Sequence, residues 1–228
     1  MKDQTKDVPI WIYLFLPLTI LFSQYIVKAL SENSYQKYFV GEMGFVELVT
    51  VLFLILAFVF GLLSFRTSLS LKFKFLPVWL ALFSLGSFYF GGEEASWGQH
   101  LFGWASPEFF ANINDQGETN LHNISGLFDQ LPRTILTIGA LLGGLILPVL
   151  VKVFKLDLSK FNLDLYVPRL NSSLAAFLAV FISFFDKLLD KSSLPGFLNI
   201  VDGENKECFL ALFLMIYIYS IFLRIRKV

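Results

Sequence analysis

Two adjacent carboxylates are the residues best suited to do chemistry in this chain. Glu93 and Glu94 follow an apolar stretch, and Trp97, Gln99 and His100 follow them. A carboxylate at the edge of the hydrocarbon is costly unless it has a partner. The pair therefore predicts a functional pocket, with Glu93 and Glu94 as candidate catalytic groups and the other three as candidate substrate-binding groups.

A helix that continued through this stretch would place Glu93, Trp97 and His100 on one face. Glu94 would lie toward Ala95 instead, so the two carboxylates need not share a partner. The alternative interpretation is a charged helix end that the headgroup region solvates.

A second polar cluster follows within eight positions. It contains Gln116, Glu118, Asn120, His122 and Asn123. We interpret His122 as a candidate catalytic base and the other four as candidate substrate-binding residues, because carboxamides, carboxylates and imidazoles orient polar ligands well. A helix over Thr119–Leu131 would place Glu118 and His122 one turn apart.

The spacing Glu118-x-x-x-His122 can bring two metal ligands together, so a divalent metal is a possible cofactor. The pattern lacks the HExxH arrangement of zinc proteases, however. A hydrogen-bonded histidine is the alternative, and the metal site stays unknown at this stage.

The segment from Gly92 to Asn123 reads GEEASWGQHLFG and then QGETNLHN. It resembles an uncharacterised bacterial multi-pass membrane protein family with an EExSWGQ … ExNLHN motif. In that pattern arginine commonly stands in the place of His100, which favours pairing of His100 with a carboxylate over metal ligation. Metal-dependent hydrolases of the alkaline ceramidase type use three histidines, whereas this chain has 2, which argues against close kinship.

These residues lie in a long connection, Gly91–Arg133, which we expect to be folded. A connection of this length is usually functional or disordered, and its aromatic residues argue against disorder. Ser106-Pro107-Glu108 predicts the start of a short interfacial helix, with Ser106 as N-cap. Phe109 and Phe110 would then enter the headgroup region as a lid or anchor.

The elements that hold this connection are predicted to be membrane helices. The chain is 56% hydrophobic and 16% charged over 228 residues, and several apolar stretches reach the ~20 residues that cross a bilayer. We predict an all-α polytopic bundle, one integral membrane domain over 1–228, with about six spans. The expected spans are Ile10–Leu30, Gly44–Phe65, Leu76 to about Trp97, Thr134–Phe154, Ser172–Leu189 and Glu207–Leu223. The fifth is short and could instead lie partly in the interface, leaving five spans.

Basic residues predict the orientation, because cytoplasmic loops retain lysine and arginine. In the six-span topology, 12 of the 18 lysines and arginines share one side with both termini. They are Lys2, Lys6, Arg66, Lys72, Lys74, Lys152, Lys155, Lys160, Arg169, Arg224, Arg226 and Lys227. We therefore expect a protein of the cell (inner) membrane with cytoplasmic termini and Gly91–Arg133 outside. The formal net charge of zero gives no basic field for nucleic acid.

Most carboxylates fall on the predicted outer side, including Glu47 and Glu207 where two spans begin. This suggests an outward-facing acidic pocket, although helix dipoles also favour acids at such positions. We favour an enzyme acting on a lipid-linked, glycan or other amphiphilic substrate. The alternatives are a transporter or ion channel that uses these boundary carboxylates, and a structural or sensory subunit. A transporter should carry charge near the bilayer midplane, and the first, fourth and sixth spans offer almost none.

Overall fold

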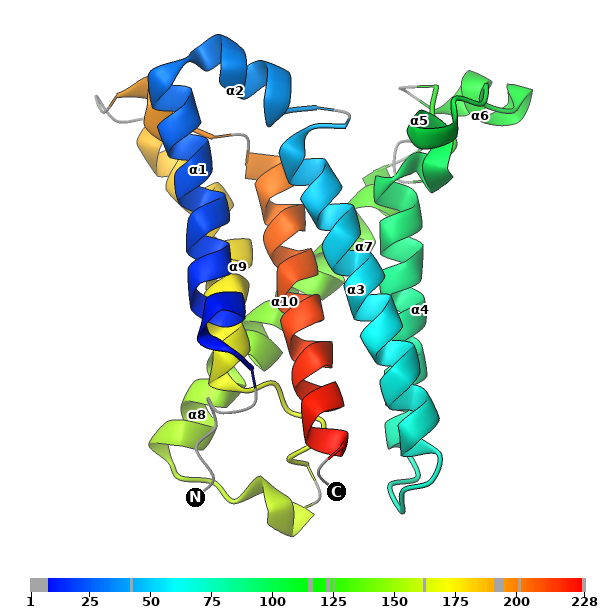
Figure 1. The fold of residues 1–228 in the computed structure, drawn as a ribbon, viewed down its shortest axis with the longest axis vertical. Coiled ribbons are helices and arrows are strands. Elements are labelled where there is room, and N and C mark those ends of the chain that lie inside the picture. The colour runs from blue at the N-terminus through cyan, green and yellow to red at the C-terminus, as the bar shows by residue number, and fades with distance from the viewer. Residues whose placement is uncertain are drawn as a thin grey trace.

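The computed structural model is a bundle of long helices that run alternately between two ends of the molecule (Figure 1). It describes residues 8–41, 43–114, 117–121, 124, 126–161, 163–190, 195–200 and 202–226. These residues contain helices and turns but no strand. The all-α prediction is therefore confirmed for the described part of the chain.

The N-terminal half forms three long helices and their connections. A π-helical segment Trp11–Phe15 leads into α1 (Leu16–Leu30), the short α2 (Glu32–Tyr38), α3 (Phe45–Ser68) and α4 (Leu76–Glu94). A 3-10 turn Ser96–Gly98 then leads to the short helices α5 (Gln99–Phe102) and α6 (Glu108–Ile113).

The C-terminal half begins with three consecutive helical segments: α7 (Gly126–Gly139), a π-helical segment Ala140–Ile146 and α8 (Leu147–Val153). The 3-10 turns Leu158–Phe161 and Leu170–Ser172 lead to α9 (Ser173–Asp190). Another 3-10 turn, Gly196–Leu198, precedes α10 (Asp202–Ile225). Both marked chain ends and the α3–α4 turn lie at one end of the bundle, and α2, α5 and α6 lie at the other (Figure 1).

Five helical segments are long and apolar enough to cross a membrane: Trp11–Leu30, Phe45–Ser68, Gln130–Val153, Leu170–Leu189 and Gly196–Ile225. They match five of the six predicted spans, including the short fifth one. The predicted third span is α4, which is not among the five. Its sequence contains serines and glycines and ends in two acids. It nevertheless runs beside α3 along the bundle (Figure 1).

Helix α10 is the centre of the bundle. The apolar window of its segment is 83% buried inside the protein, against 17% to 35% in the other four candidate spans. A buried amide pair ties it to α1: Gln24 Nε2 donates to Asn205 Oδ1 at 2.5 Å, and Asn205 Nδ2 donates to Gln24 Oε1 at 2.9 Å. In an apolar surrounding, such paired amides hold two helices in register.

Small residues bring α3 and α4 close together. A Cβ added to Gly61 would stand 2.2 Å from Ser84 Oγ, and the neighbouring Ala57 and Ser64 are also buried. Close approach through small side chains is the usual way in which membrane helices pack. This seam holds α4, and therefore the acids at its end, in a fixed position.

Candidate functional site

The end of α4 is a sharp turn, not the continuing helix that the sequence suggested. Ser96, Trp97 and Gly98 have φ of 43°, 52° and 89°, in the left-handed region that non-glycine residues rarely adopt. The Trp97 ring folds back over Gly92, where an added Cβ would lie 2.7 Å from a ring carbon. The glycine therefore makes room for the tryptophan.

Glu93 links this turn to the second polar cluster through two hydrogen bonds. Its Oε1 accepts a hydrogen bond from Trp97 Nε1 at 2.9 Å, and its Oε2 accepts one from the Leu121 backbone N–H at 2.6 Å. The side chain is 3% exposed. Both carboxylate oxygens thus accept hydrogen bonds from other residues of the protein, and these bonds fix the Leu121 segment to the end of α4.

Glu118 is the centre of a group of buried side chains with the half-buried His100, which we name the amide–carboxylate cluster: Ser96, His100, Asn114, Glu118 and Asn120. Its Oε2 accepts hydrogen bonds from Ser96 Oγ at 2.8 Å and from Asn120 Nδ2 at 2.5 Å. Its Oε1 lies 2.9 Å from His100 Nε2. The expectation that His100 pairs with a carboxylate is confirmed, whereas its predicted place on one face with Glu93 is wrong because the helix ends at Glu94.

Asn114 and Asn120 complete the amide–carboxylate cluster. Asn114 Nδ2 donates to Asn120 Oδ1 at 2.8 Å and to the Asn120 carbonyl at 3.0 Å, while Asn114 Oδ1 accepts from the Glu118 N–H at 3.1 Å. Both asparagines are buried. Because buried polar groups that bond one another rigidify a structure, this cluster fixes the shape of the connection.

Gln99 supports the same connection. Its Oε1 accepts hydrogen bonds from the Thr119 N–H at 2.7 Å and from Ser106 Oγ at 3.1 Å. The predicted short helix after Ser106 exists as α6, but Ser106 is not its N-cap, because its hydroxyl bonds Gln99 and Thr119 instead. The conditional helix over Thr119–Leu131 is wrong at its start, since α7 begins at Gly126.

The remaining predicted site residues divide into two groups. Trp97 and Gln99 take part in this folded connection, as do Glu118 and Asn120. Gln116, His122 and Asn123 lie outside the described residues, and their predicted roles stay predictions.

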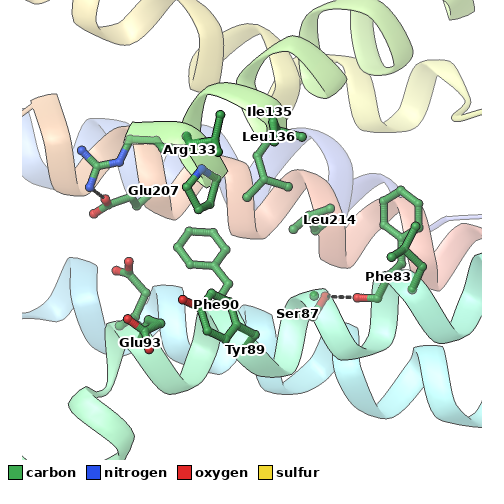
Figure 2. A pocket seen from close by; sticks show the side chains of 15 residues that line it. Phe83, Ser87, Tyr89, Phe90, Glu93, Arg133, Ile135, Leu136, Glu207 and Leu214 are labelled. Carbon is green, nitrogen blue, oxygen red and sulfur yellow. Dashed lines mark hydrogen bonds and ion pairs between the residues drawn. The ribbon is translucent and has the colours of Figure 1, made fainter. Parts of the chain in front are cut away.

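A cleft of about 420 Å³ opens beside the folded connection. Its walls are α4 and α7, and α10 forms its floor (Figure 2). Phe83, Phe90, Leu136 and Leu214 are among its apolar lining residues. The volume is within the roughly 300–1,000 Å³ of small-molecule sites.

Among the lining residues that the structure describes, the charged ones lie toward one end of this cleft. Arg133 on α7 forms an ion pair with Glu207 on α10, and Glu93 on α4 lies at the same end (Figure 2). Glu94 also lines the cleft. Because α4 runs from Leu76 to Glu94, these acids are at the end of the bundle that carries α5 and α6.

Arg133 is the site residue that sequence reasoning missed. The sequence pattern marked it only as the end of the connection, yet it pairs with Glu207 inside the cleft. The signal that could have identified it was its position: a basic residue at the start of a span, on the side where acids predominate. Pro132 also lines the cleft beside it.

The acids at the starts of α3 and α10 have different surroundings, although Glu47 lies within electrostatic range of Glu204, Glu118 and His100. Glu47 Oε2 accepts a hydrogen bond from the Met43 N–H at 2.8 Å, and Glu204 Oε1 accepts one from the Gly41 N–H at 3.0 Å. Both thus hold the α2–α3 connection, while Glu207 lines the cleft. Within the described residues, no group of three or more His, Cys, Asp or Glu side chains is placed to hold a metal ion.

Comparison with protein-family models, with curated proteins and with solved structures gave no match to this chain.

Proposed function

We propose that the chain is a membrane enzyme that binds an amphiphilic substrate in the α4–α7–α10 cleft and acts on its polar head. The observation that carries this proposal is the division of the cleft into an apolar body and a charged end. An amphiphile has the same division, so its chain would lie against Leu136 and Leu214 while its head meets the carboxylates.

Glu94 is the proposed general base. Glu93 already accepts hydrogen bonds at both oxygens, which gives it a positioning role in place of the catalytic role expected from the sequence. Glu94 lines the cleft and is half-buried, so it can take a proton from a water or a hydroxyl at the substrate head. Arg133, held by Glu207, would face negative charge that develops there. His122 stays a candidate second base.

The access route is the lipid phase. Leu82 on α4 and Leu131 and Ile135 on α7 line the cleft and are 64%, 52% and 60% exposed. In a membrane protein, apolar side chains exposed on the outside of the bundle contact lipid. The substrate would therefore enter sideways from the bilayer.

The proposed topology has six crossings with cytoplasmic termini. Helix α4 connects the turn after α3 to the opposite end of the bundle, where α5 and α6 lie (Figure 1), so it has to cross if its neighbours do. The concentration of basic residues at the end with both termini supports this orientation. Membership of the EExSWGQ … ExNLHN family and a bacterial inner-membrane location are further parts of this proposal.

The chemistry is tested by incubating the purified protein in liposomes of total lipid from the expressing cell and measuring which lipid decreases. Wild type should consume an amphiphile, and Glu94→Gln should retain bound amphiphile without consuming it. The Leu136→Trp side chain fills the cleft, so this variant should neither bind nor consume the amphiphile. The matched control is Leu142→Trp, at an exposed position of the same helical segment. Consumption by Glu94→Gln at the wild-type rate excludes Glu94 as the base.

The orientation is tested by cysteine labelling in intact cells. Asn112 on α6 and Lys72 in the α3–α4 turn are exposed. In a Cys208→Ala background, an impermeant thiol reagent should label Asn112→Cys but not Lys72→Cys. The reverse pattern means an inverted protein with a cytoplasmic cleft.

A further inference from the structure

Exposed apolar side chains gather in the short helices that follow α4. Phe102 and Phe109 are 78% and 66% exposed, and Phe102 stacks on Trp104 with ring centroids 5.8 Å apart and planes at 8°. We name the exposed Leu101, Phe102, Trp104, Phe109 and Ile113 the aromatic shelf. Single exposed apolar side chains are normal on a protein surface, whereas several together point to a surface that binds something.

The aromatic shelf does not belong to the cleft. The described lining residues of the cleft come from α4, α7 and α10, whereas the shelf residues belong to α5, α6 and the connection between these two helices. Of the two roles expected from the sequence for Phe109, lid and anchor, this arrangement favours the anchor.

The aromatic shelf lies beside the bundle at the level of the membrane boundary. Figure 1 shows α5 and α6 at the end of the bundle where α3 begins, and they extend sideways past α4. Helix α3 has 24 residues, so at a rise of about 1.5 Å per residue it is longer than the ~30 Å hydrocarbon core and its ends reach the headgroups. A segment that extends sideways at this level lies over lipid and not over other helices of the bundle.

Aromatic rings connect the shelf with the exposed side of α4. The Trp97 ring packs against Phe88 and Tyr89, with centroids 5.8 and 6.3 Å apart, and all three side chains are exposed. Phe102 folds back over Gly98, where an added Cβ would lie 3.0 Å from its ring. The exposed apolar surface of α4 thus continues into the aromatic shelf.

We propose that the aromatic shelf inserts into the headgroup–acyl boundary of the bilayer and anchors the folded connection there by apolar burial alone. Tryptophan and phenylalanine side chains suit this boundary. Lysine and arginine attract a protein surface to anionic lipid, but residues 95–121 contain neither. The anchor is therefore independent of lipid charge, and it does not depend on the proposed enzymatic function.

Helix α6 supplies matched control positions for a test. Phe109 and Ile113 are four residues apart and share one face of this helix, while Glu108 and Asn112 share another. All four side chains are exposed, so a probe at any of them leaves the amide–carboxylate cluster intact.

The test attaches a nitroxide spin label at one position at a time in the full-length Cys208→Ala protein, reconstituted in nanodiscs of neutral phosphatidylcholine. Collisions of the label with oxygen, which concentrates in lipid, are compared with collisions with a neutral, water-soluble nickel chelate. Labels on Phe102→Cys and Phe109→Cys should give an oxygen-to-nickel ratio several times higher than labels on Glu108→Cys and Asn112→Cys. Adding anionic lipid should leave these ratios unchanged.

Three results would overturn the proposal. If all four labels collide mainly with the nickel chelate, the aromatic shelf lies in water. If the labels at positions 102 and 109 are shielded from both reagents, protein covers the shelf, as in contact with a second copy of the chain. If their high ratio appears only with anionic lipid, charge and not apolar burial attaches the connection to the membrane.

Discussion

The amide–carboxylate cluster and the charged end of the cleft are neighbours at one end of the bundle. Both contain glutamates, but the surroundings of these glutamates differ. In the cluster, Glu118 is 5% exposed and surrounded by Ser96, His100 and Asn120. In the cleft, Glu94 and Glu207 border an open cavity with an apolar body. The difference separates an acid whose hydrogen bonds close a buried cluster from acids that border a cavity.

Glu93 and Glu94 both line the cleft, but Glu93 is buried and Glu94 is half-buried. Glu93 fastens the Leu121 segment and Trp97 to the end of α4. Glu94 is the next residue of the same helix and lines the cleft. The folded connection is thus fastened to the end of α4, and α4 forms one wall of the cleft. Four variants test this separation, from the largest expected change in stability to the smallest.

Removing Glu118, the central acid of the amide–carboxylate cluster, should cause the largest loss of stability. Glu118→Ala leaves Ser96, Asn120 and His100 without their carboxylate partner, and each buried donor left without an acceptor costs about 1–3 kcal/mol. We expect a strong loss of folded protein, measured as thermal unfolding in detergent. Glu108→Ala in the same connection is exposed and should stay within about 0.5 kcal/mol of wild type. Equal stability of the two variants would show that the cluster is not a structural unit.

Adding one methyl group under the tryptophan should have the next largest effect. In Gly92→Ala the new Cβ would stand 2.7 Å from the Trp97 ring, and overpacking of this kind costs about 1–3 kcal/mol. Trp97 fluorescence should also change, because the ring has to move away from Glu93. Gly139→Ala is the matched control, since nothing lies within 4 Å of its Cβ. It should be neutral or stabilising in the same unfolding assay.

Replacing Glu93 by glutamine should reduce the stability of the protein less than Gly92→Ala does. Glu93→Gln keeps the shape but turns one acceptor oxygen into an NH2 group, so either Trp97 Nε1 or the Leu121 N–H loses its acceptor. A buried donor left without a partner costs about 1–3 kcal/mol. We expect the value to fall near the low end, because the conservative change keeps one of the two bonds. Hydrogen exchange at the Leu121 amide should be faster than in wild type, and unchanged protection there would contradict the assigned bond.

The smallest loss of stability should come from removing the Ser106 hydroxyl, which bonds Gln99 and Thr119 outside the amide–carboxylate cluster. Ser106→Ala removes the hydroxyl bonds to Gln99 and Thr119, which are partly buried, and typical neutral hydrogen bonds contribute about 0.5–1.5 kcal/mol. The Thr119 N–H keeps its bond to Gln99, so the fold should persist. Thermal unfolding should show a small decrease, and amphiphile binding should be unaffected because Ser106 lies outside the cleft lining.

The sequence by itself determined the membrane class, the helical fold and most span positions, because ~20 apolar residues leave few alternatives to a spanning helix. It also identified Glu93, since a carboxylate at the membrane boundary needs a partner, and it grouped Glu118 with Asn120 as a polar cluster for ligand binding. Which partner each one takes was decided only by the tertiary structure. The left-handed turn at Trp97 ends the helix and directs His100 to Glu118, away from Glu93. The pairing of Arg133 with Glu207 joins two helices far apart in the chain, and no local spacing encodes such a contact.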